Sequence, residues 1–234
     1  TGIDLPDESQ GLLPTPQWKK EVNATILNNR YAATLKRLDE KYNALEQEAK
    51  GNQEQLEKLK RQKQQEKNQI DAEHDIDYRW NTNWQDYDTF NMSIGQGYND
   101  YTVMQLANYV ATIANGGYLM RPHIMKSVVS HEGKTLKTVK PEVIDEVDVS
   151  PATIAETRRA MLAVAQPGGT AHFLFAHFPA EFQVVAKTGT AETGRQGDNP
   201  KKDYHGVFIA FAPFADPEIA FAGVIEYGYS GGGS

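Results

Sequence analysis

The stretch Phe182-Gln183-Val184-Val185-Ala186-Lys187-Thr188-Gly189-Thr190-Ala191 decides how this chain folds. Its first five residues are largely apolar, which is typical of a short buried strand, and the pattern turns polar at Lys187. Two more strand-like runs follow a polar loop, at residues 207–212 and 219–225. The sequence therefore predicts an antiparallel meander of three strands, in which residues 182–186 bring Lys187 to the end of the first strand.

Helical patterns precede this meander. Thr102 is a suitable N-cap with Gln105 three residues later, which is the capping-box arrangement, and Gly116-Gly117 is a typical C-terminal signal. These signals predict a helix over residues 103–114. Residues 118–149 are mixed and are expected to form short strands or turns.

A second helix is predicted from Ser150-Pro151, with serine as the cap and proline in the first turn. It is expected to run to about Ala165, because Pro167-Gly168-Gly169 breaks the pattern. Helices beside an antiparallel meander indicate an α+β fold, an antiparallel sheet flanked by helices.

Residues 21–79 have a different composition, rich in Glu, Lys, Gln and Asn, with no proline and a single glycine, Gly51. Apolar residues of the first arm recur in steps of four and three: Leu27, Tyr31, Leu35, Leu38, Tyr42, Leu45 and Ala49. The second arm carries only Leu56, Leu59 and Ile70 on a comparable seam. We expect an antiparallel, coiled-coil-like helical hairpin with its turn at Gly51-Asn52, inserted between residues 1–20 and 80–234. Residues 1–20 are expected to be loop, because of Pro6, Pro14 and Pro16.

The composition excludes several classes of function. The chain has 234 residues and a net charge of −7, which argues against nucleic acid as a partner. It has no cysteine, hence no disulfide framework and no thiolate nucleophile. His172 and His177 stand five apart without a third ligand, so we expect no metal site, and no sequence pattern indicates a cofactor. Because the chain starts at Thr1 without an initiator methionine and ends directly after a strand pattern, both ends are expected to continue in a longer protein.

Several segments carry a resemblance to a known family. They are Thr1-Gly2-Ile3-Asp4-Leu5-Pro6, Ser93-Ile94-Gly95-Gln96-Gly97-Tyr98, the helix ending Ala114-Asn115-Gly116-Gly117, Gly168-Gly169-Thr170-Ala171, Ala186-Lys187-Thr188-Gly189-Thr190-Ala191, and Phe208-Ile209-Ala210-Phe211-Ala212-Pro213. In this order they resemble the transpeptidase domain of class B penicillin-binding proteins, closest to the elongation-type penicillin-binding protein 2. The resemblance covers residues 1–20 and 90–234 and leaves out the helical hairpin. It implies part of the fold that these proteins share with serine β-lactamases.

The resemblance also implies roles for Lys187–Thr190, the polar end of the stretch 182–191. Such enzymes cross-link peptidoglycan stem peptides by serine acyl transfer and are trapped by β-lactams. Lys187 would be the catalytic cation and would also face the substrate carboxylate, which the hydroxyls of Thr188 and Thr190 would bind. Gly189 would allow the substrate backbone to approach as an added strand.

The family's nucleophile motif Ser-x-x-Lys is not found in the sequence, and neither is Ser-x-Asn. In the family both motifs precede the segment that begins like Thr1. We therefore expect the nucleophilic serine to lie upstream, outside this chain, and the chain alone to be inactive. The upstream half of the domain, or a second copy of the chain, is expected to cover the open apolar edge of residues 219–225.

Alternatives remain open at this level. The parent protein is expected to be a D,D-transpeptidase on the extracytoplasmic side of the bacterial cell membrane. It could instead be a non-catalytic relative that senses peptidoglycan or β-lactams, a D,D-carboxypeptidase or a serine β-lactamase. The hairpin is expected to be a solvated spacer, with a docking surface for another cell-envelope protein, or disorder of its second arm, as the alternatives. Asp198 and residues 201–203 could gate the groove or simply be polar surface residues, and His205 could line the groove, play a structural role or be merely solvated.

Overall fold

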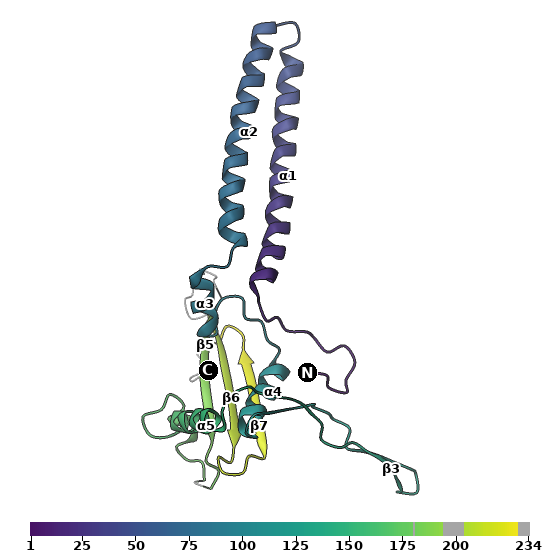
Figure 1. Ribbon diagram of the computed structural model, residues 1–234, viewed down its shortest axis with the longest axis vertical. Helices are drawn as coiled ribbons and strands as arrows, with labels where there is room; N and C mark the ends of the chain where they lie inside the picture. The colour runs from purple at the N-terminus through teal and green to yellow at the C-terminus, as the bar shows by residue number, and fades with distance from the viewer. Residues whose placement is uncertain (180, 194–203, 229–234) are drawn as a thin grey trace. The chain divides into compact units, whose positions relative to one another are not determined.

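The computed structural model describes residues 1–179, 181–193 and 204–228. The chain divides into two compact units: Pro14–Gly97 forms one, and Thr1–Leu13 together with Tyr98–Ser234 forms the other. Figure 1 shows the helical hairpin of the first unit and the sheet with its flanking helices in the second. Among the described residues, no helix combines the length and the apolar character needed to span a membrane.

The hairpin unit consists of α1 (Pro16–Glu48) and α2 (Gln53–Thr82), which lie side by side in Figure 1. Helix α1 begins five residues earlier than expected, so the prediction of loop at residues 16–20 was wrong. Pro16 stands in the first turn, where its missing N–H costs nothing, and the Thr15 hydroxyl accepts the N–H of Trp18 at 3.1 Å. The turn lies at the predicted place, with Asn52 capping α2.

The two helices meet along the predicted seam, but unevenly. Leu38, Tyr42 and Ala49 are buried, whereas Leu45 remains 36% exposed. Polar contacts supplement the seam: the Tyr31 hydroxyl donates to Asp71 at 2.7 Å and the Lys41 ammonium to Glu66 at 2.7 Å. The weakly patterned second arm is therefore a continuous helix held partly by hydrogen bonds to the first.

A buried ion pair lies at the open end of the hairpin. Helix α3 (Asp86–Ser93) follows α2, and its Asp88 accepts a hydrogen bond from the Lys19 ammonium at 2.5 Å. The two side chains are only 2% and 1% exposed, respectively. Asp88 also accepts the backbone N–H of Gln85 at 2.7 Å, which caps α3. The pair joins the first turn of α1 to α3.

The second unit contains the two helices predicted from their capping signals. Helix α4 (Val103–Ala114) has the Thr102–Gln105 capping box, and α5 (Pro151–Ala165) is capped by Ser150, so both predictions are confirmed. A short helix α6 (His172–Phe175) follows. Between α4 and α5, β1 (Tyr118–Met120) pairs with β4 (Val143–Glu146), and β2 (Ser127–Val129) pairs with β3 (Thr135–Thr138).

The N-terminal segment is tied to this unit by hydrogen bonds. The Asp4 carboxylate accepts the backbone N–H groups of Ile124 and Met125, at 2.7 and 3.0 Å. These two bonds lower the pKa of Asp4. Further along, Leu12 and Asp100 form a β-bridge. Residues far apart in the sequence are thereby held in one unit.

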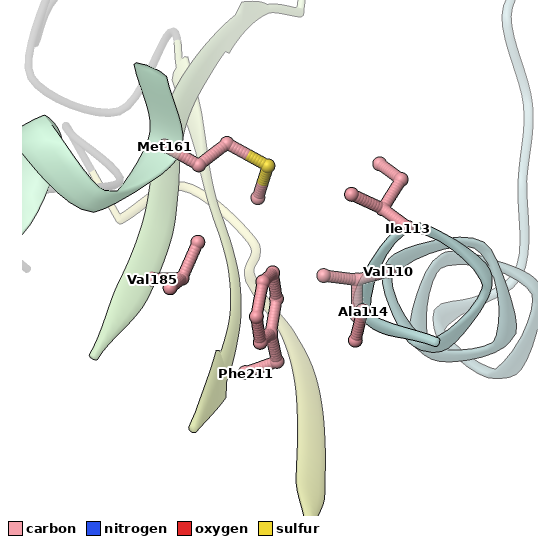
Figure 2. Packing of buried hydrophobic residues seen from close by; sticks show 6 residues of the cluster. All are labelled: Val110, Ile113, Ala114, Met161, Val185 and Phe211. Carbon is pink, nitrogen blue, oxygen red and sulfur yellow. The ribbon is translucent and has the colours of Figure 1, made fainter. Parts of the chain in front are cut away.

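The predicted meander is confirmed as an antiparallel sheet of β5 (Val185–Glu192), β6 (Tyr204–Ala212) and β7 (Ile219–Ile225). Helix α5 packs on β5, and α4 packs on β6 and β7. Figure 2 shows the core between them: Phe211 lies between Met161 and Val185 on one side and the α4 residues Val110, Ile113 and Ala114 on the other. Burial of these apolar surfaces is the main force that holds the helices on the sheet.

The outer strand β7 carries exposed apolar side chains. Ile219, Phe221 and Ile225 are 69%, 54% and 52% exposed. In the described part of the chain, β6 is the strand that pairs with β7. The expected covering of this edge by the upstream half of the domain or by a second copy stays a prediction.

Candidate functional site

The segment Lys187–Thr190 lies within strand β5, not after it. The strand begins at Val185 and continues to Glu192, so the prediction that residues 182–186 form the strand and end at Lys187 was wrong. The reason is pairing: Lys187 stands opposite Ile209, Thr188 opposite Phe208, and the pairing continues to Glu192. Hydrogen bonding to β6 keeps the polar residues extended after the apolar signal has ended.

Burial divides the strand into two parts. Val185 and Ala186 are fully buried, whereas Lys187 and Thr190 are exposed and Thr188 is half-buried. The buried residues Val185 and Ala186 anchor β5, which pairs with β6 and packs against α5. The exposed part of the strand extends beyond the core. The polar residues are therefore held on a rigid strand, which positions side chains better than a loop does.

Alternation along β5 separates the predicted site residues into two pairs. Because successive side chains point to opposite faces, Lys187 and Gly189 share the face of Val185, and Thr188 and Thr190 share the face of Ala186. The structure thus brings the two hydroxyl groups together on one face. The ammonium group of Lys187 starts from the other face, and it donates to the carbonyl oxygen of Thr188 on its own strand.

Thr188 contacts Thr170, a residue for which the sequence indicated no individual role. Its hydroxyl oxygen lies 3.1 Å from that of Thr170, within hydrogen-bond distance. Thr170 follows the glycine pair that ends the α5 segment, so the motif Gly168-Gly169-Thr170-Ala171 meets the motif of β5 in space. The break after α5 was visible in the sequence, but the distance between two residues 18 apart was not.

Gly189 is explained by the neighbouring strand. A Cβ atom at this position would lie 3.2 Å from the Cβ of Val207, its partner on β6, which is tighter than ordinary packing. A larger residue would therefore press the two strands apart. Its expected role in letting a substrate backbone approach stays a prediction.

The position of β5 in the sheet is compatible with that prediction. Within the described residues, β5 is the outer strand of the order β5-β6-β7. Its outer edge has no strand partner among the described residues, and an extended peptide added there would pair with the strand through its main chain. The hydroxyl-bearing face and the open edge belong to the same segment, Thr188–Thr190.

Two further sequence predictions concern the surroundings of this strand. His205 stands opposite Ala191, and its Nδ1 accepts the backbone N–H of Tyr227 at 3.1 Å, with the two rings 5.1 Å apart. These contacts favour the structural role over the groove-lining one. Asp198 and residues 201–203, considered as a gate, lie outside the described residues.

The chain is similar to several known proteins. The family described as "Penicillin binding protein transpeptidase domain" matches residues 1–234. Penicillin-binding protein 2A of Bacillus subtilis is 37% identical over 146 residues, which cover 58% of this chain and 20% of that protein. Peptidoglycan D,D-transpeptidase MrdA of Escherichia coli K12 is 30% identical over 163 residues, covering 65% of this chain and 25% of that protein. The chain thus spans about a fifth to a quarter of the length of these relatives.

Solved structures show the same likeness. The ceftriaxone acyl-enzyme complex of penicillin-binding protein A from M. tuberculosis is 31% identical, with a TM-score of 0.50 over 59% of this chain and 29% of that one. Penicillin-binding protein PBP2 of Helicobacter pylori, solved with MreC, has a TM-score of 0.57 over 97% of this chain and 29% of that one. At 20% identity the latter shows the fold alone, and this fold likeness extends over the hairpin.

Proposed function

This chain belongs to the penicillin-binding protein transpeptidase family, and we propose that it supplies the carboxylate-binding strand of a peptidoglycan D,D-transpeptidase. The observation that carries the proposal is the segment Lys187–Thr190, held on an outer strand with its hydroxyls on one face. The name of MrdA in E. coli, a peptidoglycan D,D-transpeptidase, supports the reaction. The acyl-enzyme complex of the M. tuberculosis protein supports reaction with β-lactams.

In this proposal the strand recognises the end of a stem peptide. The substrate, which ends in a D-Ala carboxylate, lies extended along β5 and pairs with its open edge. The hydroxyls of Thr188 and Thr190 donate hydrogen bonds to the carboxylate, and such charge-assisted bonds are about twice as strong as neutral ones. A β-lactam carries a carboxylate in a comparable place and competes for the same groups.

Lys187 acts as the cation of the site. Its exposed and flexible side chain must leave the Thr188 carbonyl oxygen and reach from its own face of β5 towards the substrate and the catalytic serine. The serine itself is proposed to lie in the upstream half of the domain. It attacks the carbonyl carbon of the stem peptide, D-Ala leaves, and the acyl group passes to the amine of a second peptide.

The hairpin and the location of the protein are further parts of the proposal. We regard residues 21–79 as an insertion into the transpeptidase domain, with residues 1–20 and 80–234 as part of that domain. The hairpin acts as a spacer or as a docking surface for a cell-envelope protein. The H. pylori protein solved with MreC has a similar fold over the hairpin as well. The parent protein is proposed to act outside the cytoplasmic membrane, in shaping the cell wall.

The test is acylation of the full-length parent protein by a fluorescent penicillin, followed by mass spectrometry. We expect one covalent adduct on a serine upstream of Thr1 and no adduct on the chain 1–234 alone. Lys187→Gln and Thr188→Val should each slow acylation at least tenfold, whereas Lys134→Gln, at an exposed turn, should not. Labelling of a serine within residues 1–234 would refute the proposal. Acylation without turnover of a stem peptide would favour the sensing alternative.

A further inference from the structure

We propose that Thr170 is a positioning residue, which orients the Thr188 hydroxyl towards the carboxylate of the ligand. The inference rests on the proposed function and adds a residue that the sequence pattern left without a role. It is carried by the 3.1 Å contact between the two hydroxyl oxygens. Thr170 itself does not need to touch the ligand.

The place of Thr170 is fixed by a tight turn on the end of α5. The backbone N–H of Gly169 donates to Gln166 at 2.8 Å, and that of Ala171 donates to Val164 at 3.0 Å. Ala171 is completely buried. Thr170 thus lies between two anchored residues, although its own side chain is exposed.

Gly169 shows how closely this turn approaches the helix. A Cβ atom there would lie 2.2 Å from the carbonyl oxygen of Val164 and 2.3 Å from that of Ala163. Backbone atoms of a helix end cannot move aside easily, so the glycine permits the close approach. Because α5 also packs on β5, the turn and the strand are held against the same helix. The backbones of Thr170 and Thr188 are therefore held close to each other by the fold.

The chemistry of hydroxyl groups explains what the contact can do. A threonine hydroxyl has one proton to donate and can accept further bonds. If the Thr170 hydroxyl donates to Thr188, the proton of Thr188 is left to point away from Thr170 and is available to another acceptor. A hydroxyl that already accepts one bond also donates more strongly, since hydrogen bonds in chains polarise each other. Thr170 thus prepares Thr188 to donate to a carboxylate.

The experiment measures acylation rate constants of the full-length parent protein with two probes, benzylpenicillin and its methyl ester, which lacks the carboxylate. Thr170→Val replaces the hydroxyl with a methyl group of similar size. We expect it to slow reaction with benzylpenicillin about fivefold, the usual size of one neutral hydrogen bond, and to leave the ester rate nearly unchanged. Thr170→Ser should restore the wild-type rate. Thr157→Val removes a hydroxyl that donates to the Thr153 carbonyl oxygen within α5, and it should change neither rate.

A double-mutant cycle decides whether Thr170 acts through Thr188. In a Thr188→Val background, Thr170→Val should cause no further loss, because the group that it orients is gone. Equal effects on acid and ester, or a full additional loss in the double variant, would overturn the inference. Thr170→Ala serves as a second variant, and melting temperatures within 2 °C of wild type, on the order expected for surface changes, exclude unfolding.

The same experiment distinguishes failure of the proposed function from failure of the positioning role of Thr170. If the wild-type protein is not acylated, or if Thr188→Val has no effect, the proposed function and the inference both fall. If wild type reacts and Thr188→Val is slow while Thr170→Val reacts like wild type, only the inference is refuted.

Discussion

Replacing Lys19 by methionine should destabilise the hairpin unit strongly. Methionine keeps most of the length and volume of lysine but removes the ammonium group that lies 2.5 Å from Asp88. The Asp88 carboxylate would remain 2% exposed with the N–H of Gln85 but without its cation. Removing one partner of such a buried pair costs roughly 3–5 kcal/mol, because the other charge stays buried and uncompensated.

A second variant separates the loss of the attraction between Lys19 and Asp88 from the cost of leaving the Asp88 carboxylate buried without a cation. In the double variant Lys19→Met/Asp88→Asn no buried charge remains, and asparagine can still accept the N–H of Gln85. We expect this variant to recover most of the loss and to lie within about 2 kcal/mol of wild type. Lys20→Met is the matched control, since the neighbouring lysine is exposed, and it should change stability by less than about 0.5 kcal/mol.

Because the chain has two compact units, a single unfolding free energy is not well defined, and hydrogen exchange by mass spectrometry is the better assay. Lys19→Met should speed exchange on peptides that cover residues 14–24 and 84–93, and leave β5 to β7 unchanged. The reasoning is refuted if exchange in Lys19→Met matches that in Lys20→Met. It is also refuted if the double variant exchanges as fast as the single one.

Three other predictions concern separate parts of the chain. Gly169→Ala would place a Cβ atom 2.2 Å from the Val164 carbonyl oxygen, so it should destabilise the turn by about 1–3 kcal/mol. Amide hydrogen exchange of residues 166–172 should become faster. Unchanged exchange would contradict this prediction. The hydrogen bond from the Lys41 ammonium keeps the pKa of Glu66 below its ordinary 4.5. The ionised Glu66 therefore stabilises the hairpin above pH 4.5, and this stabilisation is lost as the pH falls through the lowered pKa. Glu66→Gln should therefore reduce the loss of helix melting temperature between pH 7 and 3, followed by circular dichroism, and an equal loss in both proteins would argue against it. Phe221, 54% exposed on β7, should promote self-association of the chain 1–234, and Phe221→Lys should reduce it in sedimentation velocity; a strictly monomeric wild-type chain would count against an adhesive edge.

Local signals accounted for many of the elements. Thr102 with Gln105, and Ser150 with Pro151, marked the starts of α4 and α5, because caps satisfy backbone groups a few residues away. The same local rule misled at Pro16. A proline was taken as evidence for loop, whereas in the first turn of α1 it is well tolerated.

The limits of β5 could not be predicted in the same way. The apolar signal stops at Ala186, but the strand continues to Glu192 because β6 supplies its hydrogen-bonding partners. The second arm of the hairpin, weakly patterned on its own, forms a full helix beside α1, with hydrogen bonds such as that from Tyr31 to Asp71. Pairing with a distant segment overrides a weak local pattern in both cases.

The sequence by itself determined the α+β class, the helical hairpin and the segment Lys187–Thr190, since caps, periodicity and motifs act over a few residues. The contact of Thr170 with Thr188 and the extension of β5 to Glu192 were decided only by the tertiary structure. The buried pair of Lys19 and Asp88, 69 residues apart, belongs to the same group. Such features depend on where packing against α5, α3 and β6 brings each residue. A local sequence pattern does not contain the distance between two segments that come together only on folding.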